Sequence, residues 1–335
     1  MKTVLLQGKR VTDRIFEPAQ LKRLEDMGAE LVIFREEDNA SPEEAAGMMR
    51  GAEVVITSWG CPKLQGAVLE AAPDLKAVLH AAGSVKHVVT GEVWERGIRV
   101  TSGAAVLSRG VAETALGLTI MTMKNFIGTA AAVKESGWWN QRKDPIRDSI
   151  REMYGSTIGV IGGGHAGKHF LHLLKGFQLT ALLTDPTYTR EMAAEAGAEL
   201  AGLEELLQRS DIVMVLAPEI PATYRMLNGG NLTLMKEGAT LINLARGSLI
   251  DEDALVRELQ SGRIQAILDV TVQEPPGAAH PFMTLPNVML TGHIAGAVNN
   301  GLLAIGRFIV DEWGRLAAGQ KMEGEIDPSK LDTLA

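Results

Sequence analysis

Residues 156–167 read Ser-Thr-Ile-Gly-Val-Ile-Gly-Gly-Gly-His-Ala-Gly, and this stretch decides the fold. An apolar run that predicts a buried strand ends here in glycines, and residues 168–174 continue as an amphipathic helix. Gly162, Gly164 and Gly167 have the spacing that allows, in turn, a sharp turn, close approach to a pyrophosphate, and tight packing of helix on strand. Free N–H groups at the helix N-terminus favour bound phosphate. The stretch therefore predicts a dinucleotide-binding unit.

A carboxylate follows the second strand of this unit. Residues 179–183 predict that strand, and Asp185 lies 18 residues after Gly167 (185 minus 167). A carboxylate about 20 residues past the glycine turn holds the adenosine ribose, and its charge repels a 2′-phosphate. We therefore expect NAD as the cofactor in preference to NADP. Glycine turns also occur in other doubly wound domains, but the flanking strand and helix patterns favour dinucleotide binding here.

Composition and charge narrow the class of protein. The chain has 335 residues, 46% of them apolar and 22% charged, which is enough for two globular domains. Its net charge of -8, with no basic block, argues against a nucleic-acid or anionic-membrane partner. Cys61 is the only cysteine, so no intrachain disulfide forms and a reducing compartment is expected. We find no signal-peptide pattern and no apolar run of membrane-spanning length, and expect a cytoplasmic protein.

Two sets of apolar strand runs alternate with helical patterns. Each set predicts a parallel sheet with helices on its faces. Between them, residues 111–124 predict a long helix that is apolar nearly all round, as expected of an element between domains or subunits. The first set is expected at 3–6, 31–34, 54–57, 77–79 and 98–101, and the second at 156–161, 179–183, 211–216, 239–243, 264–269 and 288–291.

The order of these elements predicts the domain organisation. Residues after 299 form one more helical pattern without a sheet of their own, so we expect them to return to the first domain. The fold class is then α/β, with two doubly wound parallel-sheet domains. A Rossmann NAD-binding domain at 105–297 is inserted into a flavodoxin-like substrate domain made of 1–104 and 298–335.

Three polar side chains, Arg246, Glu274 and His293, each follow a predicted strand of the second set. Ligands of open α/β sheets bind beyond the carboxyl ends of the strands. A guanidinium suits a carboxylate and an adjacent carbonyl oxygen. A histidine held by a glutamate is an oriented acid/base, able to protonate a carbonyl oxygen while a nicotinamide delivers hydride to carbon. Taken singly, the same residues also suit a helix-capping cation, a surface acid and a core histidine.

The surroundings of these three residues carry a family resemblance. The blocks concerned are 243–255, 269–275 and 285–296, together with Val111-Ala112-Glu113. Arg246 precedes Glu274 by 28 residues (274 minus 246), and Glu274 precedes His293 by 19 (293 minus 274). In order and spacing the blocks resemble the signatures of the D-isomer-specific 2-hydroxyacid dehydrogenases, over nearly the whole chain.

The resemblance implies a homodimer that interconverts a small D-2-hydroxy acid and its 2-oxo acid with NAD. It implies a catalytic set of Arg246, Glu274 and His293, with R stereochemistry at the hydroxyl carbon. The family's substrate-carboxylate loop corresponds to residues 81–87, with backbone donors at Ser84 and Val85 beside the Arg246 side chain. The implied cofactor contacts, besides the three glycines and Asp185, are His165, Ala166, Ala217, Pro218, Leu244, Ala245 and, near the nicotinamide, Asp269.

The chain departs from the family pattern at two places. In the substrate loop Val85 replaces a second glycine, and His87-Val88 replaces an Asp-Asn pair. Backbone donors survive this change, but the Val85 side chain is expected to narrow or reshape the substrate pocket. Gly292 replaces the proline that usually precedes the histidine, which loosens that turn without removing the acid/base.

Other interpretations stay open at this point. A catalytically silent, NAD(H)-responsive interaction protein would use the same scaffold, although it has no need of the intact catalytic set. A nucleotide-dependent methyltransferase would share only the glycine turn. His165, His169 and His172 lie on one helical face, but no acid or cysteine completes a metal site, so no metal is expected. Trp138 and Trp139 suit either packing between subunits or domains, or a place over the cofactor.

Overall fold

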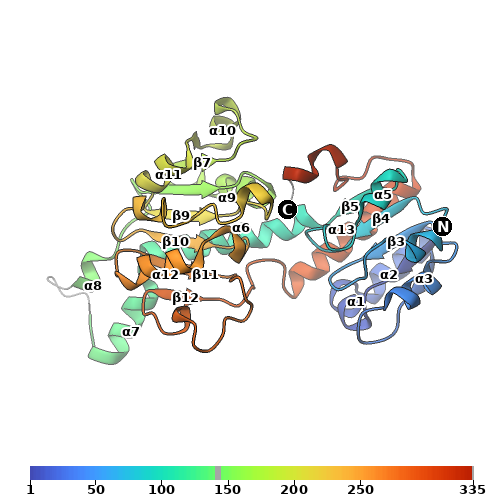
Figure 1. Cartoon of the computed structure of the whole chain (residues 1–335), viewed down its shortest axis with the longest axis horizontal. Helices are drawn as coiled ribbons and strands as arrows, with labels where there is room; N and C mark the ends of the chain where they lie inside the picture. The colour runs from blue at the N-terminus through green and yellow to red at the C-terminus, as the bar shows by residue number, and fades with distance from the viewer. Residues whose placement is uncertain (140–144, 334–335) are drawn as a thin grey trace. The chain divides into compact units, whose positions relative to one another are not determined.

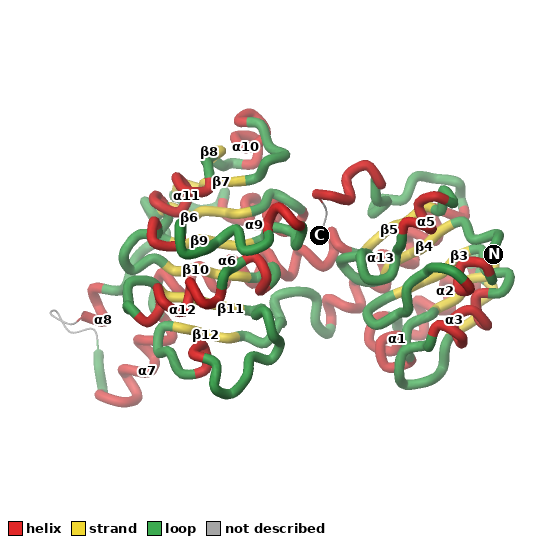
Figure 2. The backbone as a smooth tube through the Cα atoms, in the orientation of Figure 1, coloured by secondary structure: helices red, strands yellow, loops and turns green. Residues whose placement is uncertain are grey.

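The structure, a computed structural model, describes residues 1–139 and 145–333, and it divides into two compact units. The first unit comprises Met1–Ser108 and Ala297–Ala335, and the second comprises Arg109–Gly296. Each contains a parallel sheet with helices packed on it, so the expected α/β class with two parallel sheets is confirmed (Figures 1 and 2). The junctions lie at 108/109 and 296/297, where the sequence predicted 104/105 and 297/298.

The described part of the first unit has a five-stranded parallel sheet in the order β2-β1-β3-β4-β5, which is the flavodoxin-like order. All five predicted runs form strands. The strands are β1 (Lys2–Leu5), β2 (Glu30–Ile33), β3 (Val54–Thr57), β4 (Ala77–His80) and β5 (Arg99–Ser102). The helices are α1 (Lys9–Ile15), α2 (Pro18–Asp26), α3 (Pro42–Met49), α4 (Ala67–Glu70), α5 (Gly91–Glu95), α13 (Asn300–Ala317) and the 3-10 helix η5 (Pro328–Thr333).

The C-terminal helix α13 packs on this sheet. Ile305, Ile309 and Trp313 are fully or almost fully buried in one of its two cores. The indole Nε1 of Trp313 donates a hydrogen bond of 3.0 Å to Thr3 Oγ1 on β1. Helix and sheet are thus joined by apolar burial and by one buried polar contact.

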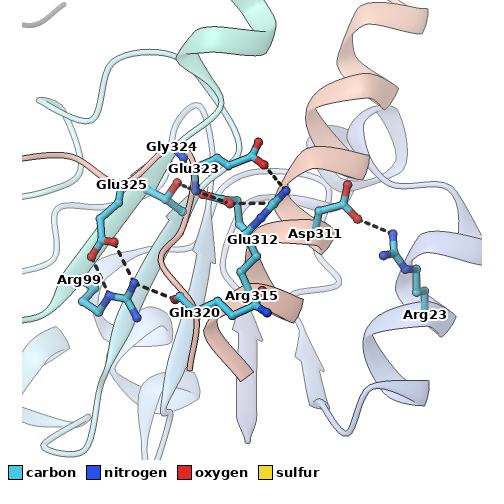
Figure 3. Close-up of polar contacts among 10 residues, drawn as sticks. Arg23, Arg99, Asp311, Glu312, Arg315, Gln320, Glu323, Gly324 and Glu325 are labelled. Carbon is cyan, nitrogen blue, oxygen red and sulfur yellow. Dashed lines mark hydrogen bonds and ion pairs between the residues drawn. The ribbon is translucent and has the colours of Figure 1, made fainter. Parts of the chain in front are cut away.

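The segment that follows α13 is tied to β5 and to α13 itself. Glu325 forms an antiparallel bridge with Thr101, and its carboxylate accepts two hydrogen bonds from the guanidinium of Arg99. Glu312 on α13 is fully buried. Its carboxylate accepts hydrogen bonds from the backbone N–H groups of Glu323 and Gly324 (Figure 3). These contacts make the tail part of the first unit.

The described part of the second unit has a seven-stranded parallel sheet in the order β12-β11-β10-β9-β6-β7-β8, a Rossmann order extended by one strand. The strands are β6 (Thr157–Ile161), β7 (Thr180–Thr184), β8 (Glu199–Leu200), β9 (Ile212–Val215), β10 (Thr240–Asn243), β11 (Gln265–Leu268) and β12 (Val288–Leu290). The helices are α6 (Ala104–Met123), which begins in the first unit, α7 (Phe126–Ser136), α8 (Pro145–Asp148), α9 (His165–Leu174), α10 (Arg190–Ala196), α11 (Leu203–Arg209), α12 (Glu252–Gln260) and the 3-10 helices η1 (Pro221–Thr223), η2 (Leu232–Leu234), η3 (Gly247–Leu249) and η4 (Pro281–Met283).

Three elements differ from the sequence-based expectations: β8, α7 and α6. The strand β8 has only two residues, too few to give a readable pattern, and α7 was not predicted at all. The helix α6 begins seven residues earlier than expected (111 minus 104). Among the described residues it is the one helix whose length and apolar composition would allow it to cross a membrane, whereas no such apolar run was expected. Length and composition alone do not separate such a span from the core helix of a soluble protein.

Candidate active site

The glycine turn after β6 has the geometry that a dinucleotide needs. Gly162 has a φ of +101°, and a Cβ there would lie 2.6 Å from the backbone of Ala217, so only glycine fits. A Cβ on Gly167 would lie 2.0 Å from the carbonyl oxygen of Gly162, which shows how closely α9 packs on the turn. No atom comes within 4 Å of the corresponding position on Gly164. The turn is therefore tight on its inner side and open at Gly164, as a bound pyrophosphate requires.

The first turn of α9 is available for phosphate. Gly164 is the N-cap residue, and no side chain caps the N–H groups that follow it. His165 stands first in the helix, and burial, followed by the charges of Lys168 and His169, lowers the pKa of its imidazole. A neutral His165 offers a phosphate a hydrogen bond and no charge, so the attraction rests on backbone N–H groups and the helix dipole.

Asp185 braces the glycine turn. Its Oδ2 accepts a hydrogen bond of 2.6 Å from the Gly163 N–H, and its Oδ1 accepts from the N–H and the hydroxyl of Thr187. A carboxylate has about four acceptor sites, so one is left for a ribose hydroxyl. The Tyr188 hydroxyl donates to the Gly163 carbonyl at 2.8 Å, and a Cβ on Gly163 would collide with the Tyr188 ring. Tyr188 could not be singled out from the sequence, because nothing in its spacing indicates a contact 25 residues back (188 minus 163).

The residues expected beside the cofactor after β9 and β10 lie at the carboxyl ends of those strands. Ala217 is 6% exposed and lies directly against Gly162. Leu244 and Ala245 are also mostly buried, in a turn held by the fully buried side chain of Asn243. The Asn243 amide donates to the Arg246 carbonyl at 2.8 Å and accepts from the Ala245 N–H at 3.0 Å. This turn delivers Arg246 to the same edge of the sheet.

Arg246 projects an exposed side chain from that turn, and its Nη1 donates to the Ala245 carbonyl at 2.6 Å. The next residue, Gly247, packs so closely on the Thr271 backbone that a Cβ would come within 2.1 Å of it. The loop carrying Arg246 is thereby fixed against the loop that leads from β11 to Glu274.

Asp269, at the end of β11, anchors the loop that carries His293. Its carboxylate is only 4% exposed and accepts hydrogen bonds from Thr291 Oγ1, the Ile294 N–H and the Ala295 N–H at 2.6, 2.8 and 2.9 Å. Its backbone carbonyl accepts from the His293 N–H at 2.7 Å. The family resemblance implied that Asp269 lies near the nicotinamide, and this stays a prediction. The hydrogen bonds by which Asp269 anchors the His293 loop were not visible in the sequence.

Glu274 and His293 form the polar centre of the site. Nδ1 of His293 lies 2.7 Å from Oε2 of Glu274, and the side chains are 49% and 39% exposed. His293 adopts a left-handed φ of +60°, after Gly292 at +70°. The glutamate occupies Nδ1, so Nε2 is the imidazole nitrogen left for a substrate. An imidazole held in one orientation at the edge of a dinucleotide-binding sheet can act as the general acid or base in carbonyl reduction.

The three histidines of α9 were compared with the arrangement that a metal ion needs, within the described residues. Within residues 1–139 and 145–333, no group of three or more metal-ligating side chains lies close enough together to hold an ion. His165, His169 and His172 share a helix face without a further ligand of this kind.

The predicted substrate loop, residues 81–87, follows β4 in the first unit. Within the described ranges, the N–H groups of Gly83, Ser84 and Val85 donate to no acceptor. Three such donors in succession suit an anion. Val85 corrects an expectation: its side chain is 4% exposed and belongs to the apolar core beneath the loop, so it does not shape a pocket. The sequence could not show on which side of the loop this residue points.

Comparison with known proteins places these features in context. Residues 116–295 match the model of the family described as D-isomer specific 2-hydroxyacid dehydrogenase, NAD binding domain. The chain is 34% identical over 272 residues to the glyoxylate reductase of Thermococcus onnurineus, which covers 80% of each chain. It is 31% identical over 319 residues to the D-3-phosphoglycerate dehydrogenase of Methanocaldococcus jannaschii, covering 95% of this chain and 59% of that longer protein.

A solved structure shows the same likeness. The crystal structure of a phosphoglycerate oxidoreductase from Rhizobium etli matches with a TM-score of 0.82 at 28% identity, over 98% of this chain and 99% of that one. The named relatives differ in the acid they act on, so their names do not agree on one substrate.

Proposed function

This chain belongs to the D-isomer-specific 2-hydroxyacid dehydrogenase family of NAD-dependent oxidoreductases, and we propose that it interconverts a small 2-oxo acid and its D-2-hydroxy acid. The observation that carries this proposal is the His293–Glu274 pair, 2.7 Å apart, in the unit that also holds the glycine turn. A protein that only senses NAD(H) gains nothing from an exposed, oriented imidazole. The pair therefore favours catalysis over a silent interaction role.

Each polar residue has a distinct part in the proposed reaction. The glycine turn and Asp185 would hold NADH, which would supply the hydride. His293 donates a proton from Nε2 to the carbonyl oxygen, and Glu274 at Nδ1 keeps the imidazole oriented and supports its positive charge. Arg246 binds the substrate carboxylate and polarises the carbonyl. In oxidation the same imidazole takes the proton back.

The substrate carboxylate has a second set of donors in this proposal. These donors are the N–H groups of Ser84 and Val85 in the first unit, which have no acceptor among the described residues. The first unit thus acts as the substrate domain and the second as the NAD-binding domain. Glyoxylate is the first substrate to test, because the Thermococcus relative is named a glyoxylate reductase.

We also propose a cytoplasmic homodimer that uses α6 and α7. Only 33% of the apolar window of α6 is buried, and Phe126 and Trp139 remain 55% and 78% exposed. Together with Thr129, Ala130, Val133 and Trp138 they line an apolar hollow. A second copy would cover these side chains. Trp139→Asp should shift the sedimentation coefficient from dimer to monomer, and a monomeric wild type would overturn the assembly.

A substrate panel tests the function. The purified full chain is mixed with NADH and, separately, glyoxylate, hydroxypyruvate, pyruvate and bulkier 2-oxo acids, and absorbance at the NADH band is followed. We expect turnover with at least one acid, D-configured product where the carbon is chiral, and a preference for NADH over NADPH. Tight NADH binding without turnover on the whole panel would support the silent interaction protein instead.

A further inference from the structure

Gly163, the middle residue of the glycine turn, has both of its backbone polar groups bound by side chains of the loop that follows β7. Its N–H donates to Asp185 Oδ2 at 2.6 Å. Its carbonyl accepts from the Tyr188 hydroxyl at 2.8 Å. The N–H lies in the peptide plane shared with Gly162, and the carbonyl lies in the plane shared with Gly164. Two successive peptide planes of the turn are therefore held from one loop.

The ring of Tyr188 occupies the space in which a side chain at position 163 would lie. The three heavy atoms nearest to a Cβ on Gly163 would all belong to this ring, which is too close for a side chain to fit. The φ of Gly163 lies outside the left-handed region, so the backbone itself would accept an alanine. The ring is thus what requires glycine at this position.

Two further interactions favour Tyr188 as a neutral hydrogen-bond donor in this place. Burial, followed by the negative charge of Asp185, raises the pKa of its hydroxyl, so the proton that it donates is retained. The Lys168 Nζ on α9 lies 5.9 Å from the centre of the ring, within the range of a cation–π interaction. The ring therefore joins the glycine turn to the helix that follows it.

The contact between Tyr188 and Gly163 sets the direction of the Gly164 N–H. The carbonyl of Gly163 and the N–H of Gly164 belong to one trans peptide, in which they point in opposite directions. The Gly164 N–H therefore points away from the Tyr188 hydroxyl, and within the described ranges it donates to no acceptor. Gly164 is also where the turn is open, because no described atom lies within 4 Å of its Cβ position.

We propose that Tyr188 is a positioning residue of the cofactor site, which holds the Gly163 carbonyl so that the Gly164 N–H is directed at the pyrophosphate of NAD(H). The inference rests on the proposed function, because it takes the glycine turn as the dinucleotide site. Tyr188 acts through the backbone and not by touching the cofactor. Asp185 has a separate part, since one acceptor site of its carboxylate is left for a ribose hydroxyl.

A residue that positions a pyrophosphate donor has an effect that other roles do not share. NADH and NADPH carry the same pyrophosphate and differ at the 2′-position of the adenosine ribose. Loss of positioning should therefore raise the dissociation constants of both coenzymes by the same factor. A direct contact of Tyr188 with the ribose would change the two unequally, and a role in stability alone would change neither.

The first experiment compares Tyr188→Phe with Tyr154→Phe in the full chain, by fluorescence titration with NADH and with NADPH. Tyr188→Phe removes the hydroxyl and keeps the ring, so we expect both dissociation constants to rise about three- to tenfold, as for the loss of one hydrogen bond. At saturating NADH, kcat and the KM for the 2-oxo acid should stay within about twofold. Tyr154 is 76% exposed and precedes β6 at the end away from the turn, so Tyr154→Phe should change neither constant.

The second experiment uses the collision between the ring and a Cβ at position 163. Gly163→Ala should displace the ring and weaken NADH binding at least as much as Tyr188→Phe. In Tyr188→Ala the ring is absent, so adding Gly163→Ala to that variant should change the dissociation constant by less than about twofold. Thermal unfolding of each variant shows that the folded protein is being titrated.

Several results would overturn the positioning role while leaving the proposed function standing. These are an unchanged NADH dissociation constant in Tyr188→Phe, an equal rise in Tyr154→Phe, unequal factors for the two coenzymes, and additive losses from Gly163→Ala and Tyr188→Ala. A wild-type protein that binds neither coenzyme would overturn both the positioning role and the proposed function.

Discussion

Nδ1 of His293 lies 2.7 Å from Oε2 of Glu274, and the two residues come from the loops that follow the paired strands β12 and β11. Parallel strands end at one edge of a sheet, which is why residues 19 positions apart (293 minus 274) meet. The loop backbone is fixed on its other side by Asp269, whose buried carboxylate binds the Ile294 and Ala295 N–H groups. Glu274 thus orients the imidazole of His293, and Asp269 holds the backbone of the loop that carries it.

Replacement of His293 should separate catalysis from cofactor binding. We expect His293→Gln to lower kcat for 2-oxo acid reduction by about 10²- to 10⁴-fold, the usual contribution of a general acid. NADH affinity, measured by fluorescence titration, should stay within about twofold, because the glycine turn is not altered. Glu274→Gln should have a smaller effect in the same direction, since the imidazole stays in place but loses its charged partner. Wild-type rates in both variants would remove the pair from the mechanism.

Asp185→Ala should relax the preference for NADH over NADPH. Removal of the carboxylate ends its repulsion of a 2′-phosphate, and a tenfold change in the ratio of the two kcat/KM values corresponds to about 1.4 kcal/mol. NADH binding should also weaken, because Asp185 holds the Gly163 N–H at 2.6 Å. Tyr188→Phe, which removes only the hydroxyl that contacts the Gly163 carbonyl, is the matched control. An unchanged coenzyme ratio in Asp185→Ala would mean that another residue sets the preference.

The stability of the first unit should depend on pH through His80. Its pKa falls from the ordinary 6.5 to about 4 on folding, so the unfolded chain binds more protons between these values. Its contribution is fully present above about pH 6.5 and is lost as the pH falls towards 4, by about 3 kcal/mol in total. Urea unfolding at a series of pH values should show this slope in the wild type and a flatter one in His80→Gln. Parallel slopes in the two proteins would contradict the assignment.

Local patterns predicted the sheets well because each central strand is apolar on both faces. Val54–Thr57 and Thr240–Asn243 are buried at every position, so a short unbroken apolar run suffices to find them. The glycine spacing and the family signatures then located the candidate catalytic residues. What patterns could not supply were contacts between distant segments.

Three residues illustrate that limit. The direction of the Val85 side chain depends on the core below its loop. The hydrogen bonds of Asp269 reach a loop that lies 22 to 26 residues further along the chain (291 minus 269, 295 minus 269). The contact of Tyr188 with Gly163 depends on how the glycine turn folds. Each follows from tertiary packing. None changes the local periodicity from which secondary structure is predicted.

Glu312 offers the sharpest test of how the tail is held. Its fully buried carboxylate accepts hydrogen bonds from Thr101 Oγ1 at 2.6 Å, from the N–H groups of Glu323 and Gly324 at 2.9 Å, and from Arg315 Nη1 at 3.0 Å (Figure 3). Glu312→Gln would turn an amide N–H₂ towards donors and remove one of the two acids that pair with Arg315, leaving Glu323 as the other. Because breaking a buried pair costs about 3 to 5 kcal/mol, we expect a loss of about 3 kcal/mol in the free energy of unfolding.

The neighbouring residue provides the control for this change. Asp311 pairs with Arg23 at 2.7 Å, but both side chains are about half exposed, so Asp311→Asn should cost at most about 1 kcal/mol. Limited proteolysis gives a second readout, because release of residues 320–326 from β5 should expose them to cleavage in Glu312→Gln and not in Asp311→Asn. Equal stabilities and equal cleavage in the two variants would show that the tail is held by apolar contacts of α13 alone.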